Sequence, residues 1–307
     1  MTKTVRTTPP PAATASVREL SGPPARVPAL ARAVLPAVPG IGLLPGVRHT
    51  GTDLPDLVLA QSGVRIDRSA VAAYARVCGF PLTDDLPATY PHVLAFGLHM
   101  ALLTDPVFPF APLGLVHLDN TITSHRPLDA DEVLDVRVHA CSLRTHPKGR
   151  LVDLISTVHV GDELVWEDTT TLLARGGGDT AAAADSAVRA LTAPTGPVTW
   201  RLPADIGRRY AAVSGDSNPI HLYGLTARAF GFPRQIAHGM WTKARCLAAL
   251  QGRLPGSFTV EVAFKKPVLL PATVQFGTRP EADGATLMGV TARSGTEHLV
   301  GRVTPRG

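Results

Sequence analysis

The chain has 307 residues, of which 45% are hydrophobic and 18% charged. This composition is typical of one large or two small folded domains and excludes a disordered chain. The formal net charge is +5, but six basic side chains against one acidic side chain in residues 1–50 account for all of it, and residues 51–307 are neutral. Because a nucleic-acid partner requires a basic surface on the folded part, we expect none.

The cysteines and the apolar runs narrow the class of protein further. Cys78, Cys141 and Cys246 are too few and too scattered for a disulfide framework or a zinc site. We therefore expect no bound metal and a reducing compartment. The best apolar run, 34–44, contains two prolines and falls short of the ~20 residues of a membrane span. The sequence thus predicts a cytoplasmic protein without a membrane span.

Residues 1–50 are rich in Pro, Ala and Thr. Such a segment buries too little apolar surface to order itself, so we predict a disordered or loosely packed tail. Within it, Leu30 to Leu44 could pack on the body as a short helix or strap. The Arg-bearing, acid-poor start resembles a transit peptide, but its prolines argue against the amphipathic helix that such peptides form.

Residues 51–175, the first half of the folded part, contain helical patterns followed by strands. Asp67 is a plausible N-cap for a helix through Val71 and Tyr74. Residues 93–103 are apolar nearly all round, which predicts a buried helix. Alternation with a period of two, interrupted by turn residues, then predicts an antiparallel sheet. Its strand-like runs are 115–124, 133–141, 151–160 and 165–173.

Residues 176–194, GGGDTAAAADSAVRALTAP, have the composition of a flexible linker. The same order of elements then recurs in residues 195–307, the second half. A short strand precedes a helix ending near Val213, and a buried helix is expected from about Ile236 to Leu250. Four strand-like runs close the chain: 258–264, 273–278, 286–292 and 299–303.

Local sequence supports an internal repeat. YARVCG at 74–79 resembles YAAVSG at 210–215, and LHM at 98–100 resembles HGM at 238–240. Each half is one long buried helix followed by an antiparallel run, the hot-dog arrangement in which a sheet curls round a helix. We predict an α+β fold of the double hot-dog type, a covalent pseudo-dimer whose sheets join edge to edge. The chain would act as a monomer of this kind or as a homodimer.

The segment between the two helical patterns of the second half is the densest in chemistry. Turn residues at 214–216 break the first helix, and Pro219 prevents a simple continuation through Asn218. Asp216, Asn218 and His221 therefore lie on an irregular loop, where a carboxylate and an imidazole can handle a proton and a water. Spacing alone leaves open a simpler interpretation, in which they are an Asp N-cap, an Asn turn and a surface His.

The string G-D-x-N-P-x-H at 215–221, with A-H-G-M at 237–240, resembles the hydratase-2 motif of the MaoC-like (R)-specific enoyl-thioester hydratases and dehydratases. TYPHVLAFGLHMALL (89–103) and FPFAPLGLVH (108–117) resemble the actinobacterial-type double hot-dog 3-hydroxyacyl-thioester dehydratases. The resemblance begins near residue 54 and reaches the end of the chain. One departure is Tyr223, where many members carry Asp or Asn, which affects local ligand contacts more than the Asp–His pair.

The resemblance implies the reversible dehydration of a (3R)-hydroxyacyl thioester to a trans-2-enoyl thioester. CoA or the phosphopantetheine of an acyl-carrier protein would be part of the substrate, and no separate cofactor is implied. Asp216 and His221 would share the acid–base work through one water. Asn218 would orient them, with a turn role as the alternative. The backbone N–H of Gly239, at the start of the buried helix, would bind the thioester oxyanion, with a packing role as the alternative.

Further substrate contacts are expected beside the motif. Ser214, Gly215 and His238 border the Asp–His pair, and we expect His238 to be structural rather than catalytic. Lys265 and Lys266 could touch a cofactor phosphate, although such a pair at a strand end is more often simply solvated.

The repeat is chemically unequal, because the first half has Phe80 where the second has Asp216. We therefore expect one active site per chain. The first half would be the acyl-chain side, with Phe80 and a wholly apolar helix forming its wall. Ala95 and Gly97 would line a tunnel for the acyl chain.

Two other functions remain open at the level of sequence. A hot-dog thioesterase would hydrolyse the carbonyl and release free thiol, and a non-catalytic acyl-thioester-binding protein would bind without turnover. The sequence also leaves open the acyl length, the carrier, the physiological direction, and which of Asp216 and His221 moves the α-proton.

Overall fold

The computed structural model describes residues 9–11, 15–22, 52–182 and 186–306. The strands up to the end of the first half are β1 (Ser16–Glu19), β2 (Leu57–Val64), β3 (Leu115–Ser124), β4 (Leu134–His146), β5 (Gly149–Val160) and β6 (Glu163–Arg175). Those of the second half are β7 (Val198–Leu202), β8 (Phe258–Phe264), β9 (Ala272–Pro280), β10 (Thr286–Ala292) and β11 (Glu297–Pro305).

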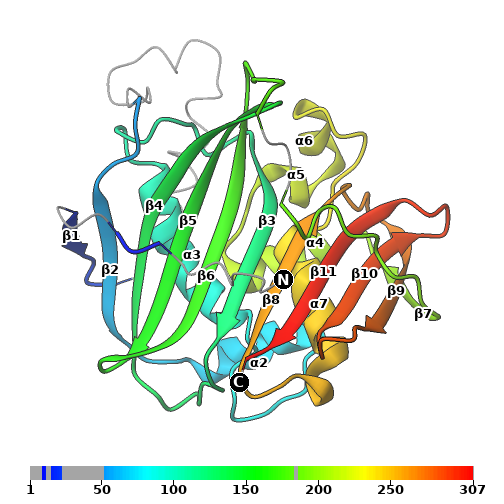
Figure 1. Cartoon of the computed structure of the whole chain (residues 1–307), viewed down its shortest axis with the longest axis horizontal. Coiled ribbons are helices and arrows are strands. Elements are labelled where there is room, and N and C mark those ends of the chain that lie inside the picture. Colours follow the sequence, from blue (N-terminus) through cyan, green and yellow to red (C-terminus); the bar gives the residue numbers. More distant parts are fainter. Residues whose placement is uncertain (1–8, 12–14, 23–51, 183–185, 307) are drawn as a thin grey trace.

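These strands form one curved sheet that wraps around the helices (Figure 1). The strand order is β1-β2-β4-β5-β6-β3-β8-β11-β10-β9-β7, and only β1–β2 is a parallel pair. Outward from the central pair β3–β8, the two halves repeat the same order of strands. Thr121 lies opposite Glu261 at the centre of that antiparallel pair. The α+β double hot-dog fold, with the sheets joined edge to edge, is therefore confirmed.

One long helix fills each half of the curved sheet. The helices are α2 (Arg68–Cys78), α3 (Tyr90–Leu103), α4 (Ile206–Ser214), α5 (Pro219–Leu222), α6 (Gly224–Ala229), α7 (Gly239–Leu250) and the 3-10 turn η3 (Gln251–Arg253). In Figure 1, α3 lies behind the strands of the first half and α7 beside those of the second. Helix α2 begins where predicted, because the Asp67 carboxylate accepts from the Ser69 N–H at 2.8 Å.

The starts of the two long helices differ from the sequence prediction in opposite directions. Helix α3 begins at Tyr90, earlier than expected, and α7 begins at Gly239, later than Ile236. Tyr90 is thus the structural counterpart of Gly239, and His99 lies well inside α3. The proposed correspondence of residues 98–100 with 238–240 is wrong. It rests on the likeness of two short strings, one of which lies inside α3 and the other at the start of α7.

Part of the predicted tail joins the sheet. Residues 16–19 form β1, which pairs with β2 in parallel, with Ser16 opposite Leu57, although all four side chains are exposed. The backbone pairing of an edge strand requires no buried side chain, which is why composition did not reveal it. The predicted strap at 30–44 lies outside the described residues. Within the described parts of the chain, no helix is long and apolar enough to cross a membrane.

The second part of the predicted flexible linker is packed rather than flexible. Val188 and Ala193 of this segment form a small buried cluster with Ala263 of β8 and Val300 of β11. The Arg189 guanidinium donates to Leu118 O at 2.6 Å and to Phe264 O at 3.1 Å. This segment therefore ties β3 to β8. The prediction of a flexible linker rested on the abundance of Gly and Ala, and it gave no weight to the single valine and arginine that make these contacts.

Candidate active site

The loop that carries the predicted acid–base residues begins where α4 ends. Gly215 has a φ of 82°, a left-handed conformation that suits glycine and turns the chain out of the helix. Asp216 follows, and Asn218 then caps α5 by accepting from the Ile220 N–H at 3.3 Å. The turn role that the sequence left open for Asn218 is therefore present in the structure. Ser214 is buried, and its hydroxyl accepts from the Asp216 N–H at 3.2 Å.

The side chains of one aspartate and two histidines lie close together at this loop. The ligand-type atoms of Asp216, His221 and His238 lie within 4.8 Å of one another. The rings of His221 and His238 stack with centroids 3.7 Å apart. His238 Nε2 donates to the backbone oxygen of Asp216 at 3.0 Å and lies 3.8 Å from its carboxylate. We call these three residues the dyad site, in which His238 holds the loop that carries Asp216.

Hydrogen bonds to carbonyl groups identify the tautomers. His221 Nδ1 lies 2.8 Å from Ile236 O, which can only accept, so Nδ1 carries the proton. His221 Nε2 therefore keeps a lone pair that can take a proton. His238 has the opposite tautomer, because its Nε2 donates to Asp216 O. Its buried Nδ1 has no hydrogen-bond partner among the described residues.

The surroundings keep both members of the Asp–His pair in their basic forms. Burial would raise the pKa of Asp216, but His238, His221 and the Asn218 N–H outweigh it and hold that pKa below its usual value. Burial lowers the pKa of His221, against the opposing effect of Asp216. Burial also lowers the pKa of His238, to about 3. At neutral pH the site therefore holds a carboxylate beside neutral imidazoles.

Gly239 occupies the first position of α7, where two features bear on its role. The first intrahelical bond runs from the Thr242 N–H to His238 O at 3.1 Å, so the earlier N–H groups have no acceptor within the helix. They offer donors and the positive end of the helix dipole beside the dyad site. A Cβ on Gly239 would also lie 3.0 Å from the ring of Phe264. The packing alternative is thus present, alongside an amide that a thioester can approach.

The same three side chains are close enough to be considered as metal ligands. However, the rings of His221 and His238 are within 26° of parallel, and each already donates to a carbonyl oxygen. Stacked rings direct their lone pairs side by side rather than at one point, as a tetrahedral metal requires. The geometry suits proton transfer better than metal binding.

Comparisons with known proteins agree with this site. The family model described as "MaoC like domain" matches residues 183–296. The "3-hydroxyacyl-thioester dehydratase X" of Mycobacterium tuberculosis is 42% identical over 234 residues, which are 76% of this chain and 83% of that protein. The chain belongs to the MaoC-like dehydratase family.

Solved structures extend the likeness to the whole fold. A crystal structure of HtdX from Mycobacterium tuberculosis superposes with a TM-score of 0.72 and 38% identity, covering 81% of this chain and all of that one. A MaoC-like dehydratase from Phytophthora capsici has the same fold at a TM-score of 0.65 and 18% identity, covering 81% of this chain and 94% of that one. The family relationship therefore includes both halves of the double hot dog.

The first half differs from the predicted apolar wall. Phe80 is a core residue that stacks on Tyr74 with ring centroids 6.4 Å apart. Ala95 is fully buried, whereas Gly97, two residues further along α3, points to the opposite side of the helix and is half-buried. Ala95 and Gly97 thus lie on different sides of α3, and their part in an acyl tunnel stays a prediction. The helix is not wholly apolar either, because His92 and His99 are buried on it.

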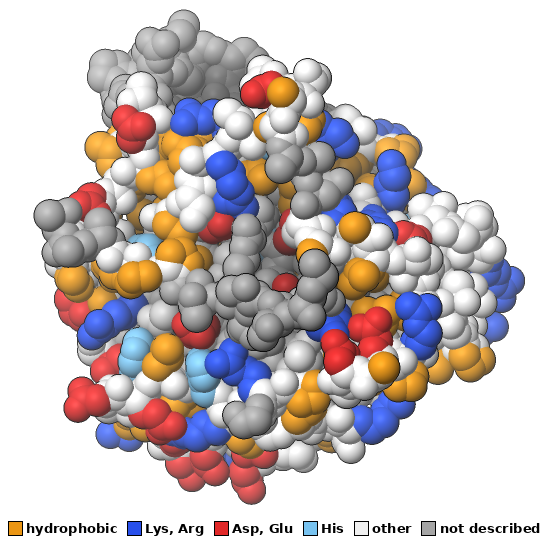
Figure 2. Space-filling view, viewed as in Figure 1, with side chains coloured by type: hydrophobic (Ala, Val, Ile, Leu, Met, Phe, Trp, Pro, Cys, Tyr) orange, Lys and Arg blue, Asp and Glu red, His pale blue; other side chains and the backbone are white. Residues whose placement is uncertain are grey.

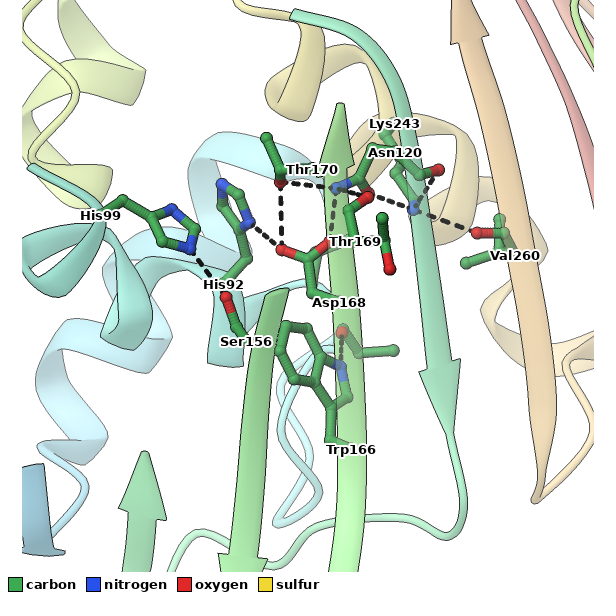
Figure 3. Close-up of polar contacts among 12 residues, drawn as sticks. His92, His99, Asn120, Ser156, Trp166, Asp168, Thr169, Thr170, Lys243 and Val260 are labelled. Atoms are coloured by element: carbon green, nitrogen blue, oxygen red, sulfur yellow. Dashed lines mark hydrogen bonds and ion pairs between the residues drawn. The ribbon is translucent and has the colours of Figure 1, made fainter. Parts of the chain in front are cut away.

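These histidines belong to a buried polar network that sequence reasoning missed (Figure 3). His92 Nδ1 lies 2.6 Å from Asp168 Oδ2, and Asn120 Nδ2 donates to Asp168 Oδ1 at 2.5 Å. Lys243 Nζ donates to Asn120 Oδ1 at 2.5 Å. A second contact joins His99 Nε2 to the Ser156 hydroxyl at 2.7 Å. We call the chain of bonds from His92 to Lys243 the inter-half relay.

The sequence did contain a signal for this network. The period of two in β6 places Asp168 on the same face as Trp166, and both are fully buried. Lys243 is also fully buried, in the helix that the sequence predicts to be buried. Burial lowers the pKa of Lys243 to about 7, against the opposing effect of Asp168. Charged residues at such positions are almost never fully buried unless paired, so each predicts a partner elsewhere.

Proposed function

We propose that this protein catalyses the reversible dehydration of (3R)-hydroxyacyl thioesters to trans-2-enoyl thioesters. The observation that carries this proposal is the dyad site, which sets an ionised carboxylate and a neutral imidazole beside the N-terminus of α7. The relative named 3-hydroxyacyl-thioester dehydratase X, with which this chain shares 42% identity, supports the same reaction class.

The reaction needs a base at Cα and a proton for the departing β-hydroxyl. Asp216 and His221 are both in their basic forms at neutral pH, so neither brings a proton of its own. The proton taken from Cα is therefore the one that leaves with the β-hydroxyl as water, while the C–O bond breaks and the C=C bond forms. Hydration runs the same steps in reverse, and no net proton is taken up or released. Each acid–base task contributes about 10²–10⁴-fold in rate.

The thioester oxygen gains negative charge when Cα loses its proton. We assign its stabilisation to the free N–H groups at the start of α7, with Gly239 allowing close approach. Ser214 and Gly215 support this arrangement by fixing the turn that presents Asp216. Asn218 acts through the loop, since its side chain caps α5.

The test is the hydration of crotonyl-CoA and longer enoyl-CoAs, followed as loss of enoyl absorbance. We expect turnover in the wild-type protein and at least a ~10²-fold loss in Asp216→Asn and in His221→Gln. His139→Gln is the matched control, since His139 is a buried histidine on β4, within the first half. Release of free thiol would indicate a thioesterase, and binding without turnover an acyl-thioester-binding protein. Either result would overturn the proposal.

The carrier is either CoA or an acyl-carrier protein, because both present the thioester on the same phosphopantetheine arm. Matched enoyl-CoA and enoyl-carrier substrates would decide between them through kcat/KM. We place the reaction in the cytoplasm, because Cys78, Cys141 and Cys246 are free. We also propose a pseudo-dimeric monomer or a homodimer, which light scattering of the purified protein distinguishes.

A further inference from the structure

The second half carries an exposed surface that the first half lacks. It inserts α5 and α6 before its long helix, whereas the corresponding stretch of the first half, 79–89, contains no helix. Three large hydrophobic side chains of this insert are exposed: Tyr223 at 56%, Leu225 at 80% and Phe230 at 37%. They are three of the eight such side chains in the described parts of the chain, and they lie within eight consecutive residues. Single exposed apolar residues are normal, but a cluster rimmed by polar groups marks an interaction site.

The charges on this surface have one sign. Residues 217–235 include two exposed arginines, Arg228 and Arg234, and no acidic residue. Arg208 of α4 adds a third guanidinium, which lies 5.0 Å from the centroid of the Tyr223 ring. The three arginines donate to carbonyl oxygens or to solvent, and among the described residues none of them pairs with a carboxylate. We give the name α5–α6 surface to six residues: Arg208, Tyr223, Leu225, Arg228, Phe230 and Arg234.

The α5–α6 surface is the outer side of the segment that forms the dyad site. His221 on α5 is 8% exposed, whereas Tyr223, two residues further on, faces solvent. The Thr226 hydroxyl of α6 donates to Pro219 O at 2.6 Å and fixes α6 against α5. Figure 2 shows Lys or Arg side chains beside hydrophobic ones at the upper right of the molecule, where α6 lies in Figure 1. A partner bound to this surface would therefore lie beside the dyad site.

The composition of this surface indicates an acidic protein as its partner. Aromatic side chains and arginines are enriched in protein interfaces, where acidic residues are depleted. Guanidiniums without carboxylate partners favour a negative surface opposite them. They disfavour a second copy of this chain, because a two-fold contact uses the same patch on both subunits and would bring the arginines together. A nucleotide could use the guanidiniums for its phosphates, but it would have no need of the exposed Leu225 and Phe230.

We propose that the α5–α6 surface docks an acidic acyl-carrier protein, which delivers the acyl thioester to the dyad site on its phosphopantetheine arm. The inference rests on the proposed function and selects the protein from the two carriers that remain open there. The arginines steer the acidic carrier towards the surface, and the exposed apolar side chains are covered in the complex. Tyr223, whose ring lies against Arg208, is the expected anchor of the contact, because tyrosine and arginine are enriched among interface hot spots.

The direct experiment measures binding without turnover. A fluorescently labelled, acidic holo-acyl-carrier protein of type II fatty-acid synthesis is titrated with the full chain, and its fluorescence anisotropy is recorded. We expect saturable binding to the wild-type protein. The double variant Arg228→Glu with Arg234→Glu should raise the Kd at least ~10-fold, because it reverses two charges of the surface. Leu225→Ser should raise the Kd about threefold without any change in charge.

The matched controls make the same changes in the first half. Arg65, Arg76 and Leu82 are exposed on or beside α2, which lies far from α6 in Figure 1. Arg65→Glu with Arg76→Glu, and separately Leu82→Ser, should leave the Kd within about twofold of wild type. In turnover, the variants of the α5–α6 surface should lower kcat/KM for an enoyl-carrier substrate by the same factor as they weaken binding. The kcat/KM for the same enoyl-CoA should change less than about twofold.

The inference is overturned if a wild-type protein that hydrates enoyl-CoA does not bind the carrier, or if the control variants weaken binding equally. An equal loss with enoyl-CoA would overturn it too, because the arginines would then serve the phosphates of CoA. A dimer that Leu225→Ser dissociates, or binding to phosphatidylglycerol vesicles that the same variant abolishes, would assign the surface to a second copy or to a membrane instead. Carrier binding through this surface without any hydration would overturn the proposed function, whereas the docking surface would stand.

Discussion

The two halves of the molecule share a frame and diverge at one corresponding point. Helices α2 and α4 both end at a left-handed glycine, Gly79 and Gly215, with φ of 83° and 82°. The next residue is Phe80 in the first half, packed in the core, and Asp216 in the second, on the loop of the dyad site. The second half then inserts α5 and α6 before its long helix. The loop of the dyad site is therefore accommodated between two helices that both halves share, without a change in the order of the strands.

The comparison also shows that the half without the motif is not inert. It contributes His92, Asn120 and Asp168 to a network that ends on Lys243 of the other half. The second half thus holds the proposed acid–base groups, and the first half holds most of the inter-half relay. The predictions below test this division of labour, from the largest expected effect to the smallest.

The largest contrast is between counterpart positions Asp216 and Phe80. Asp216→Asn should reduce turnover by ~10²–10⁴-fold, because it removes the charge from the acid–base pair. Phe80→Leu should change turnover less than threefold, roughly 0.6 kcal/mol, because Phe80 is packed in the hydrophobic core. Steady-state hydration rates measure both. A comparable loss in both variants would mean that the first half takes part directly in the chemistry.

Variants of the inter-half relay should lower the free energy of unfolding more than variants of a partly exposed ion pair do. Asp168→Asn or Lys243→Met should each lower the free energy of unfolding by about 1–3 kcal/mol, since each leaves a buried hydrogen-bonding partner in the relay unsatisfied. The double variant should lose less than the sum. Lys265→Met, which breaks a partly exposed pair with Glu297, should cost about 1 kcal/mol or less. Denaturant titration gives all four values, and strict additivity of the first two would argue against a connected relay.

Gly239 and its counterpart Tyr90 begin equivalent helices. Only the backbone N–H of Gly239 is proposed to bind the thioester oxygen, so only this position needs an accessible amide. Gly239→Ala should lower kcat by about tenfold, because the new methyl group presses on Phe264 and obstructs the amide. The double variant Gly239→Ala with Phe264→Leu relieves the contact. Turnover that stays low in the double variant supports the oxyanion role, whereas full recovery would leave Gly239 with a packing role only.

Buried neutral histidines should make the protein sensitive to acid. Burial lowers the pKa of His99, His117 and His238 to about 3 in each case. Below pH 6.5 these histidines become protonated in the unfolded chain but stay neutral in the folded protein. The free energy of unfolding therefore falls as the pH drops from about 6.5 towards 3. At pH 4 each imidazole should cost on the order of 1–3 kcal/mol. Unfolding free energies across this range should decline less steeply in His99→Gln.

The connection between the halves should show the smallest effect on activity. Residues 176–182 are mostly exposed, whereas residues 186–194 contain the packed Val188 and Arg189. Limited proteolysis should therefore cut the first segment and spare the second, with turnover unchanged. Cleavage within 186–194 of the native protein would mean that this segment does not hold the central strands together.

The sequence predicted those features that depend on neighbours in the chain. The alternation of β3–β6, the Asp67 cap and the loop from Asp216 to His221 each follow from residues a few positions apart. The inter-half relay could not be predicted in the same way. Asn120, Asp168 and Lys243 become partners only when β3, β6 and α7 meet, and no local pattern fixes that contact. The packing of Arg189 on β3 and β8 was hidden for the same reason.

The continuous junction of β3 with β8 joins two hot-dog units within one polypeptide. In a homodimer of identical subunits, every codon change alters both copies, so a residue that benefits one position must be tolerated at its twin. Here a codon change alters only one position of each pair. Tyr90 and Gly239, or Phe80 and Asp216, can therefore be selected separately while the shared backbone is kept. Because one polypeptide carries both units, each unit can acquire its own substitutions, which two identical subunits of a homodimer cannot do.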